Sequence, residues 1–258
     1  MKKLQFIFLL VSQFIFSQEL HIKYIFKPSS YRLFEENIYI NKNTKIAILD
    51  SIPLKSNRLE LLNEDDNSIN QMIKTKYPKY KKIIIDKNVK GYDNILEIDQ
   101  IENTNYQVVD NMPKMNWDIS HTDTKKIGKY ICKKATAEYR GGYYTAYYTR
   151  EIPVSAGPYK FKGLPGLILE LKSDGINPKH WYATEVEFPY KGQIPINNNY
   201  IKSLPIITKK TFVEKADKKQ KEELEIIASK RPKGAFRVES KVYRPGIEQK
   251  FEWEKDKD

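Results

Sequence analysis

Short runs in which apolar and polar side chains alternate recur along this chain, and they constrain its fold more than any other feature. In residues 20–26, Ile22, Tyr24 and Phe26 alternate with the polar residues His21 and Lys23 and with Ile25. Alternation with a period of two is typical of a strand with one buried face. Strands that follow one another through short turns form antiparallel sheets. The sequence therefore predicts a sheet that is mainly antiparallel.

Turn-forming residues divide the chain between these runs. Asn41–Thr44 separates two of them as a hairpin loop, and Gly141-Gly142 separates two others. The expected strands are residues 20–26, 36–40, 45–49, 82–86, 95–99, 106–109, 129–139, 143–150, 167–171, 181–188, 236–243 and 247–253.

Two segments show the spacing of an amphipathic helix instead. Residues 67–76 place apolar side chains on one face and end before Pro78. Residues 211–230 carry an apolar stripe, and Thr211 with Glu214 has the spacing of a capping box. The predicted fold class is therefore α+β, mainly antiparallel β, with one long and one short helix packed on the sheet.

The first residues have the composition of a secretory signal peptide. Met1-Lys2-Lys3 is followed by a mostly apolar stretch of about 13 residues and then by Ser17, a small residue suited to cleavage. Such a stretch is shorter than the ~20 residues that a membrane span needs. We expect residues 1–17 to be removed on export and residues 18–258 to form a single domain without a transmembrane span.

The chain carries a formal net charge of +12, which comes mainly from lysine. Only seven of its 45 basic residues are arginine. Proteins that recognise phosphates or bases specifically tend to use the planar fork of arginine. Together with the expected export, this composition argues against nucleic acid as a partner.

The sequence offers little reaction chemistry. It has no His-Glu-x-x-His pair, no Gly-x-Ser-x-Gly motif and no phosphate-binding glycine loop. Cys132 lies in an apolar run, so we expect it in the core rather than as a nucleophile. His121 and Asp123 share a polar loop, and two such side chains alone do not make a metal site. We therefore expect no catalytic residue, no metal and no cofactor.

The segment Gly163-Leu164-Pro165-Gly166-Leu167-Ile168 combines a turn with the start of a strand. Pro165 presets the first central position of a type II turn, and Gly166 supplies the positive φ of the next. Gly163 allows the backbone to approach another element closely. The apolar run that begins at Leu167 and Ile168 predicts a buried strand.

Aromatic residues are concentrated just before this segment. Five tyrosines lie between residues 139 and 148. Such rings either pack within the sheet, where aromatic residues are common, or line an apolar cavity. For a cavity, the expected lining residues are Tyr147, Tyr159, Phe161 and Leu164.

Residues 126–135, 145–154, 157–158 and 163–168 together carry a combined motif. In this order and spacing they resemble the GLPGLI family of exported proteins from Bacteroidota, over about residues 117–171. The family pattern often has Trp where this chain has Tyr147. The resemblance implies a location in the cell envelope. It supplies no catalytic residue, because the activity of the family is not established.

The order of strands is also similar to the LolA-like lipoprotein-carrier architecture, in which a curved antiparallel sheet holds a hydrophobic ligand. This likeness adds curvature to the expected sheet, but a fold does not fix a function.

These observations predict an exported, non-enzymatic protein of the periplasm or the outer envelope. Its curved sheet would bind a lipid, another hydrophobic ligand or a lipidated partner. The alternative is an interaction component that works with a membrane receptor or another envelope protein through a flat surface. The third hypothesis is a hydrolase or thiol enzyme, but the sequence lacks the groups that such chemistry needs.

Overall fold

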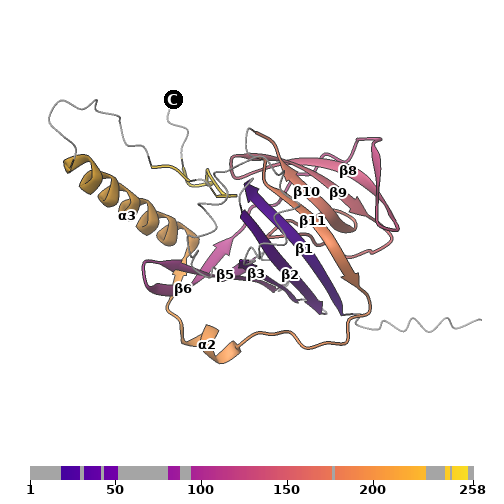
Figure 1. Cartoon of the computed structure of the whole chain (residues 1–258), viewed down its shortest axis with the longest axis horizontal. Helices are drawn as coiled ribbons and strands as arrows, with labels where there is room; N and C mark the ends of the chain where they lie inside the picture. The colour runs from indigo at the N-terminus through magenta and orange to yellow at the C-terminus, as the bar shows by residue number, and fades with distance from the viewer. Residues whose placement is uncertain are drawn as a thin grey trace, which may run out of the picture.

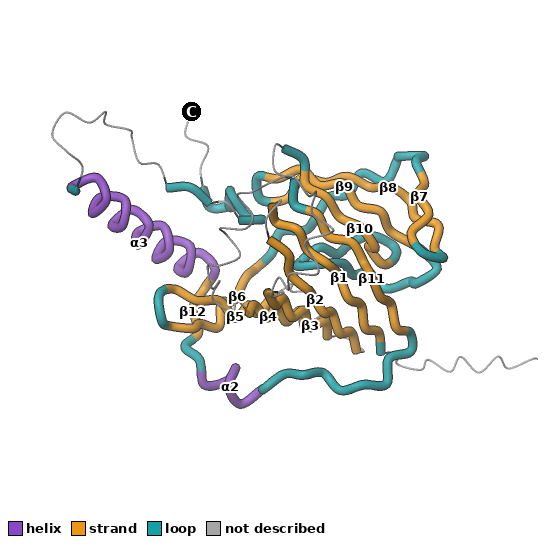
Figure 2. The backbone as a smooth tube through the Cα atoms, viewed as in Figure 1, coloured by secondary structure: helices purple, strands orange, loops and turns teal. Residues whose placement is uncertain are grey.

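The computed structural model describes residues 19–29, 32–41, 44–51, 81–87, 94–175, 178–230, 242–244 and 246–254. Strands dominate this part of the chain (Figures 1 and 2). In chain order the elements are β1 (Leu20–Ser29), β2 (Arg32–Asn41), β3 (Thr44–Ser51), β4 (Lys81–Lys87), β5 (Asn94–Ile101), β6 (Thr104–Asn111), β7 (Thr124–Ile127), β8 (Tyr130–Tyr139), β9 (Gly142–Thr149), β10 (Leu167–Ser173), β11 (His180–Glu187), α2 (Asn198–Ser203), β12 (Ile206–Thr208) and α3 (Lys209–Ser229).

The described strands form one sheet with the order β12-β6-β5-β4-β3-β2-β1-β11-β10-β9-β8-β7. All neighbours pair antiparallel except β12 and β6, which pair in parallel. Strand β1 joins two halves of the sheet, because it pairs with β2 on one side and β11 on the other. The N-terminal half contains β1–β6 with β12 at its edge, and the C-terminal half contains β7–β11. The sheet is curved (Figure 1). The expected class, α+β with a curved and mainly antiparallel sheet and one long helix, is confirmed.

Alternation along the strands builds the interior face of the sheet. Leu20, Ile22 and Tyr24 of β1 are fully buried on this face. Next to them, the ring of Phe26 stacks on that of Trp181 from β11, with centroids 4.0 Å apart. Aromatic packing therefore ties the N-terminal half of the sheet to the C-terminal half.

Residues 150–166, which we call the interior segment, connect β9 to β10 and lie against the interior face. Phe161 is fully buried, and its ring centroid lies 4.6 Å from that of Tyr144 and 6.3 Å from that of Trp181. The hydroxyl of Tyr24 donates to the carbonyl of Ile168 at 2.6 Å, where the segment enters β10. The curved sheet thus closes around part of its own chain.

Residues 188–205, which include α2, cover the outer face of β2–β5 and lead from β11 to β12 (Figure 2). A second apolar cluster forms there between Tyr39, Ile48, Ile85 and Ile201. Helix α3 buries residues only near its start, and the rest of it extends away from the sheet (Figure 1). Within the described residues, no helix is both long and apolar enough to cross a membrane.

Two local expectations are wrong. Helix α3 is capped by Thr208 rather than Thr211, because the Thr208 side chain accepts a hydrogen bond from the Thr211 amide at 3.1 Å. Residues 247–253 alternate but form no strand. Their backbone instead forms hydrogen bonds with the turn between β8 and β9: the amides of Gln249 and Lys250 both donate to the carbonyl of Arg140.

The short elements of the fold were not predicted from the sequence. Strands β7 and β12 and helix α2 have four, three and six residues, too few to show a clear period. The expected signal peptide at 1–17, the expected helix at 67–76 and residues 236–241 lie outside the described part of the chain.

The two glycines of the Gly163–Ile168 segment exchange their expected roles. Gly163 has a φ of 101°, whereas Gly166 is not in the left-handed region. A Cβ atom on Gly166 would lie 2.0 Å from the carbonyl oxygen of Thr149. Gly163 is therefore required by backbone conformation and Gly166 by close approach to the end of β9. Leu167 and Ile168 are fully buried, as expected.

Candidate ligand-binding site

The interior face of the N-terminal half carries charged side chains where other strands carry apolar ones. Burying a charge is costly unless it is paired and hydrogen-bonded, so each of them requires a partner. None is more than 8% exposed: they are Glu36 of β2, Lys45 of β3, Lys82 and Asp86 of β4, Glu97 of β5 and Asp110 of β6.

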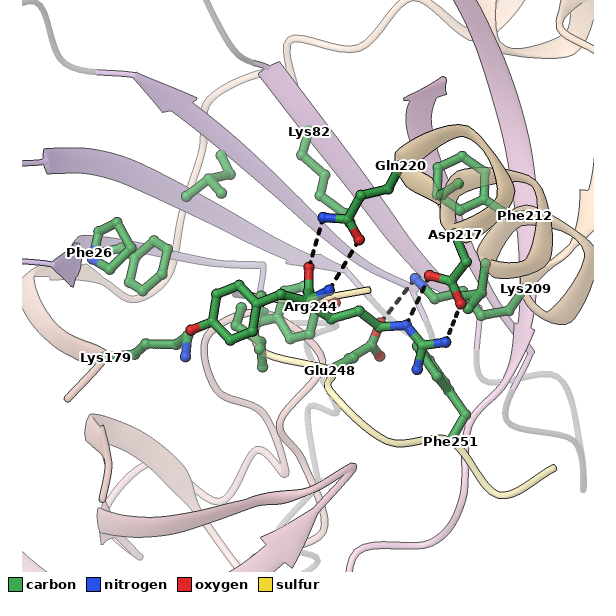
Figure 3. Close-up of a pocket in the computed structure, with 18 of the residues that line it drawn as sticks. Phe26, Lys82, Lys179, Lys209, Phe212, Asp217, Gln220, Arg244, Glu248 and Phe251 are labelled. Carbon is green, nitrogen blue, oxygen red and sulfur yellow. Dashed lines mark hydrogen bonds and ion pairs between the residues drawn. The ribbon is translucent and has the colours of Figure 1, made fainter. Parts of the chain in front are cut away.

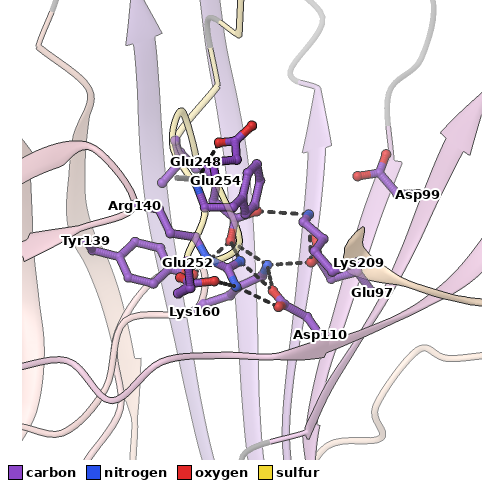
Figure 4. Close-up of polar contacts among 12 residues, drawn as sticks. Glu97, Asp99, Asp110, Tyr139, Arg140, Lys160, Lys209, Glu248, Glu252 and Glu254 are labelled. Atoms are coloured by element: carbon purple, nitrogen blue, oxygen red, sulfur yellow. Dashed lines mark hydrogen bonds and ion pairs between the residues drawn. The ribbon is translucent and has the colours of Figure 1, made fainter. Parts of the chain in front are cut away.

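Lys160 of the interior segment supplies the central cation (Figure 4). Its Nζ lies 2.6 Å from Asp110 Oδ2 and 2.7 Å from Glu248 Oε1, and it also pairs with Glu97. The three carboxylates lie within 4.8 Å of one another, a spacing that would also suit a divalent cation. Here the ammonium of a lysine occupies their centre, so the cluster is an ion-pair network built from the chain's own residues.

Two further cations complete this network (Figure 4). Arg140, in the turn between β8 and β9, donates to both oxygens of Asp110 at 2.8 Å and to Glu248 at 2.6 Å. Lys209, the first residue of α3, lies 3.0 Å from Glu97 and 2.9 Å from Glu248. Charges therefore join β5, β6, the β8–β9 turn, the interior segment, α3 and the C-terminal segment 246–254.

The cations keep the buried acids ionised. Burial raises the pKa of Glu97, but Lys160, Lys209 and Lys82 outweigh burial and hold that pKa well below its usual value. The pKa of Glu248 is depressed in the same way, by Lys160, Lys209 and Arg140 acting against burial. This part of the interior is thus a set of compensated charges at neutral pH.

Separately from this network, the buried pair Glu36 and Lys45 holds the turn at Tyr159. Glu36 Oε1 accepts a hydrogen bond from the Tyr159 amide at 2.7 Å, and Lys45 Nζ donates to the carbonyls of Gly157 and Tyr159 at 2.6 and 2.7 Å. Tyr159 has a φ of 52°, a left-handed conformation that costs a non-glycine residue about 1–2 kcal/mol. The pair therefore holds a strained residue in place.

Burial perturbs both members of this pair. It raises the pKa of Glu36 to about 7, although Lys45 and the Tyr159 amide act in the opposite direction. It lowers the pKa of Lys45 to about 8, although Glu36 and Asp86 favour its charged form. Glu36 thus titrates much nearer to neutral pH than an ordinary carboxyl group.

A cavity of about 680 Å³ lies between the interior face of β1–β4, the first turns of α3 and the C-terminal segment (Figure 3). Tyr159, Lys82, Lys209 and Glu248 line it as well, so the buried charges form its floor. Its volume is within the range of ~300–1,000 Å³ typical of small-molecule sites. The wall is mainly apolar and includes Phe26, Phe34, Leu49, Phe212, Val213 and Ile247.

Polar contacts tie α3 to Tyr243 and Arg244, which precede the C-terminal segment, at the rim of the cavity (Figure 3). Arg244 Nε donates to Asp217 at 3.0 Å, and Arg244 Nη2 donates to Glu254 at 2.7 Å. The side chain of Gln220 donates to the carbonyl of Tyr243 at 3.0 Å and accepts from its amide at 3.1 Å. These contacts close one side of the cavity.

Lys179 at the rim differs from the other cations. It directly precedes β11, is half-buried, and has no acidic partner among the described residues. Burial lowers the pKa of its ammonium group. A half-buried cation with no counter-charge among the described residues is unusual at a cavity whose other described charges are paired.

The structure separates the four residues that were expected to line a cavity. Tyr159 lines this one. Phe161 and Leu164 are at most 1% exposed and lie in the core. Tyr147 lies on β9, and its ring is covered by the ammonium of Lys125 at 5.1 Å.

The other candidate groups lie apart from the cavity. Cys132 is buried, and burial raises the pKa of its thiol to about 11, which disfavours a thiolate nucleophile. His121 Nε2 lies 3.0 Å from the hydroxyl of Thr136, within hydrogen-bond distance.

Sequence reasoning missed the ion-pair network. Its signals are weak: Glu97 interrupts the apolar run 95–98, and Lys160 lies between Tyr159 and Phe161. A charged residue in apolar surroundings can equally point to solvent. Its partners here lie many residues away, where no local pattern indicates them.

A model of a Bacteroidota-type family, described as "Protein of unknown function (Porph_ging)", matches residues 141–170. This stretch covers β9, the interior segment and the start of β10. No curated protein matches the chain.

Solved structures resemble the chain in fold alone. PNGF-II in space group P21 has a TM-score of 0.50 at 15% identity, covering 76% of this chain and 32% of that chain. PNGF-II in space group C2 has a TM-score of 0.48 at 16% identity, covering 74% and 31%. An uncharacterized conserved protein from Thermus thermophilus has a TM-score of 0.35 at 6% identity, covering 75% and 92%. The chain thus spans about a third of the PNGF-II chains, and these neighbours do not show the expected LolA likeness.

Proposed function

We propose that this protein is an exported, non-enzymatic component of the cell envelope that binds a hydrophobic, lipid-like ligand between its curved sheet and α3. The observation that carries this proposal is the cavity of about 680 Å³ with a mainly apolar wall. Replacing water by an apolar ligand at such a wall is favourable by roughly 25 cal/mol for each Å² of apolar surface that becomes buried.

The ionisable groups of the floor favour binding over catalysis. Glu248 and Lys209 line the cavity, and each is engaged in ion pairs at 2.6–3.0 Å. A general base or nucleophile has to be available to its substrate, whereas these groups are committed to one another. Their role is to join the elements that surround the cavity.

Location in the envelope is supported by the N-terminal composition and by the GLPGLI-type motif. The Porph_ging match covers the interior segment, whose turn at Tyr159 reaches the cavity.

Native mass spectrometry of the full protein, purified from the periplasm of cells that export it, tests the proposal. We expect a bound lipid-like mass that survives gentle ionisation. Ala216→Trp, which fills the cavity from α3, should abolish it, and Ala228→Trp on the exposed end of the same helix is the matched control.

The proposal would be contradicted if the purified wild-type protein carries no ligand and also binds no lipid that is added to it. That outcome would favour the alternative function, an interaction component that works with a membrane receptor or another envelope protein. Loss of the ligand in both tryptophan variants would also count against this cavity as the binding site.

A further inference from the structure

The charged groups that line the cavity are balanced, with one exception. Lys82 lies 2.7 Å from Glu97 and 2.6 Å from Asp99, and Lys209 is held by Glu97 and Glu248. Arg244 is held by Asp217 and Glu254. Within the described residues, Lys179 is the lining cation that no acid neutralises.

The position of Lys179 places this unbalanced charge at one end of the apolar wall. Pairing of Lys27 with His180 sets residue 179 beside Pro28, which also lines the cavity. In Figure 3, Lys179 and Phe26 lie at one side of the cavity, and Lys209 and Phe212 lie at the other. An apolar chain whose head group lies at Lys179 would enter the apolar part of the cavity, to which Phe34 and Leu49 belong.

We infer that the ligand is an amphiphile with a single negative charge, such as a long-chain carboxylate, and that Lys179 binds its head group. This inference rests on the proposed function and adds the chemical class of the ligand. One negative charge compensates Lys179. A second would find the other described cations that line the cavity already paired and would lie near the acids of the floor.

Burial of Lys179 supports the assignment. Its pKa is lowered because burial disfavours the charged ammonium and no described carboxylate offsets this effect. A bound carboxylate would supply the missing counter-charge in surroundings where a charge-assisted hydrogen bond is strong.

Calorimetric titration of the full protein with three ligands of equal chain length tests the inference, with the two charged ligands below their critical micelle concentrations and dodecanol below its solubility limit. Dodecanoate carries one charge, dodecanol carries none, and dodecyl phosphate carries between one and two at neutral pH. We expect dodecanoate to bind about tenfold more tightly than dodecanol or dodecyl phosphate. In Lys179→Gln the advantage of dodecanoate over dodecanol should disappear. It should persist in Lys191→Gln, which changes an exposed lysine on the outer face.

The outcomes separate the inference from the proposed function. If none of the three ligands binds, both fail. If dodecanol binds as tightly as dodecanoate, or if Lys179→Gln keeps the preference, the cavity binds apolar chains but Lys179 does not select the head group. If dodecyl phosphate binds most tightly, the limit of one charge is wrong.

Discussion

Lys160 occupies a position among Glu97, Asp110 and Glu248 that solvent or an ion would otherwise have to fill. Its partners come from two strands and from the C-terminal segment, so one side chain connects regions far apart in sequence. A buried ion pair is weak evidence for net stability, but removing one member leaves an uncompensated buried charge.

Replacing this lysine by an apolar residue of similar length should therefore be severe. We expect Lys160→Met to lower the free energy of unfolding by about 3–5 kcal/mol, measured by urea denaturation at neutral pH. The exposed Lys191→Met is the control and should change it by less than about 0.5 kcal/mol. If Lys160→Met does not fold, adding Asp110→Asn should restore part of the folded population. A loss of less than about 1 kcal/mol would contradict the role given to Lys160.

Glu36 predicts an unusual dependence of stability on pH. A carboxyl whose pKa rises from 4.5 to about 7 on folding binds its proton more tightly in the folded state. Its contribution to stability is therefore greatest below pH 4.5 and is lost as the pH rises towards 7. Lys45, with a pKa of about 8, titrates mostly above this window.

Glu36→Gln removes this titration and keeps an oxygen that can accept from the Tyr159 amide. Denaturation curves of both proteins between about pH 5 and pH 7.5 should show the wild type losing stability relative to the variant as the pH rises. Glu138→Gln on the exposed face of β8 controls for the loss of one carboxyl group. Parallel stability curves for wild type and Glu36→Gln would show that Glu36 is not perturbed.

At the scale of elements, alternation identified the long strands but not the segments whose neighbours decide their conformation. β1–β6, β8, β9 and β11 lie where alternation or a short apolar run predicts a strand, and β10 is predicted by its continuous apolar run, because it is buried on both faces. Residues 247–253 show the same alternation but form no strand, since Glu248 enters the ion-pair network and the backbone hydrogen-bonds to the carbonyl of Arg140 in the β8–β9 turn. Periodicity reports which side chains are apolar, and it does not report which backbone partner is available.

The turn before β10 shows the same limit and gives a test. In Gly166→Ala the new methyl group would lie 2.0 Å from the Thr149 carbonyl oxygen, so strands β9 and β10 would have to separate. We expect a loss of about 3 kcal/mol in the free energy of unfolding, from chemical denaturation. Gly128→Ala, with a φ of 57° and no atom within 4 Å of its new Cβ, should lose only about 1–2 kcal/mol. Equal losses in the two variants would contradict close approach as the reason for glycine at position 166.

For the whole molecule, the sheet closes around its own interior segment through contacts between distant residues. Lys45 and Gly157, for example, are 112 residues apart in sequence. The fold class and the antiparallel order of most strands could be predicted from local patterns. The ion-pair network and the cavity above it could not, because they depend on how the sheet curves and on where α3 and residues 246–254 meet it. Of the four residues expected to line a cavity, only Tyr159 lies in a turn that reaches the cavity. The other three lie on a strand or in the core.

A crystal structure of the full protein with dodecanoate tests most directly whether the cavity is the binding site. We expect electron density for one alkyl chain along Phe34 and Leu49, with the carboxylate within hydrogen-bond distance of Lys179 Nζ. Density at another surface, or a cavity left empty in crystals of protein that binds dodecanoate in solution, would contradict it.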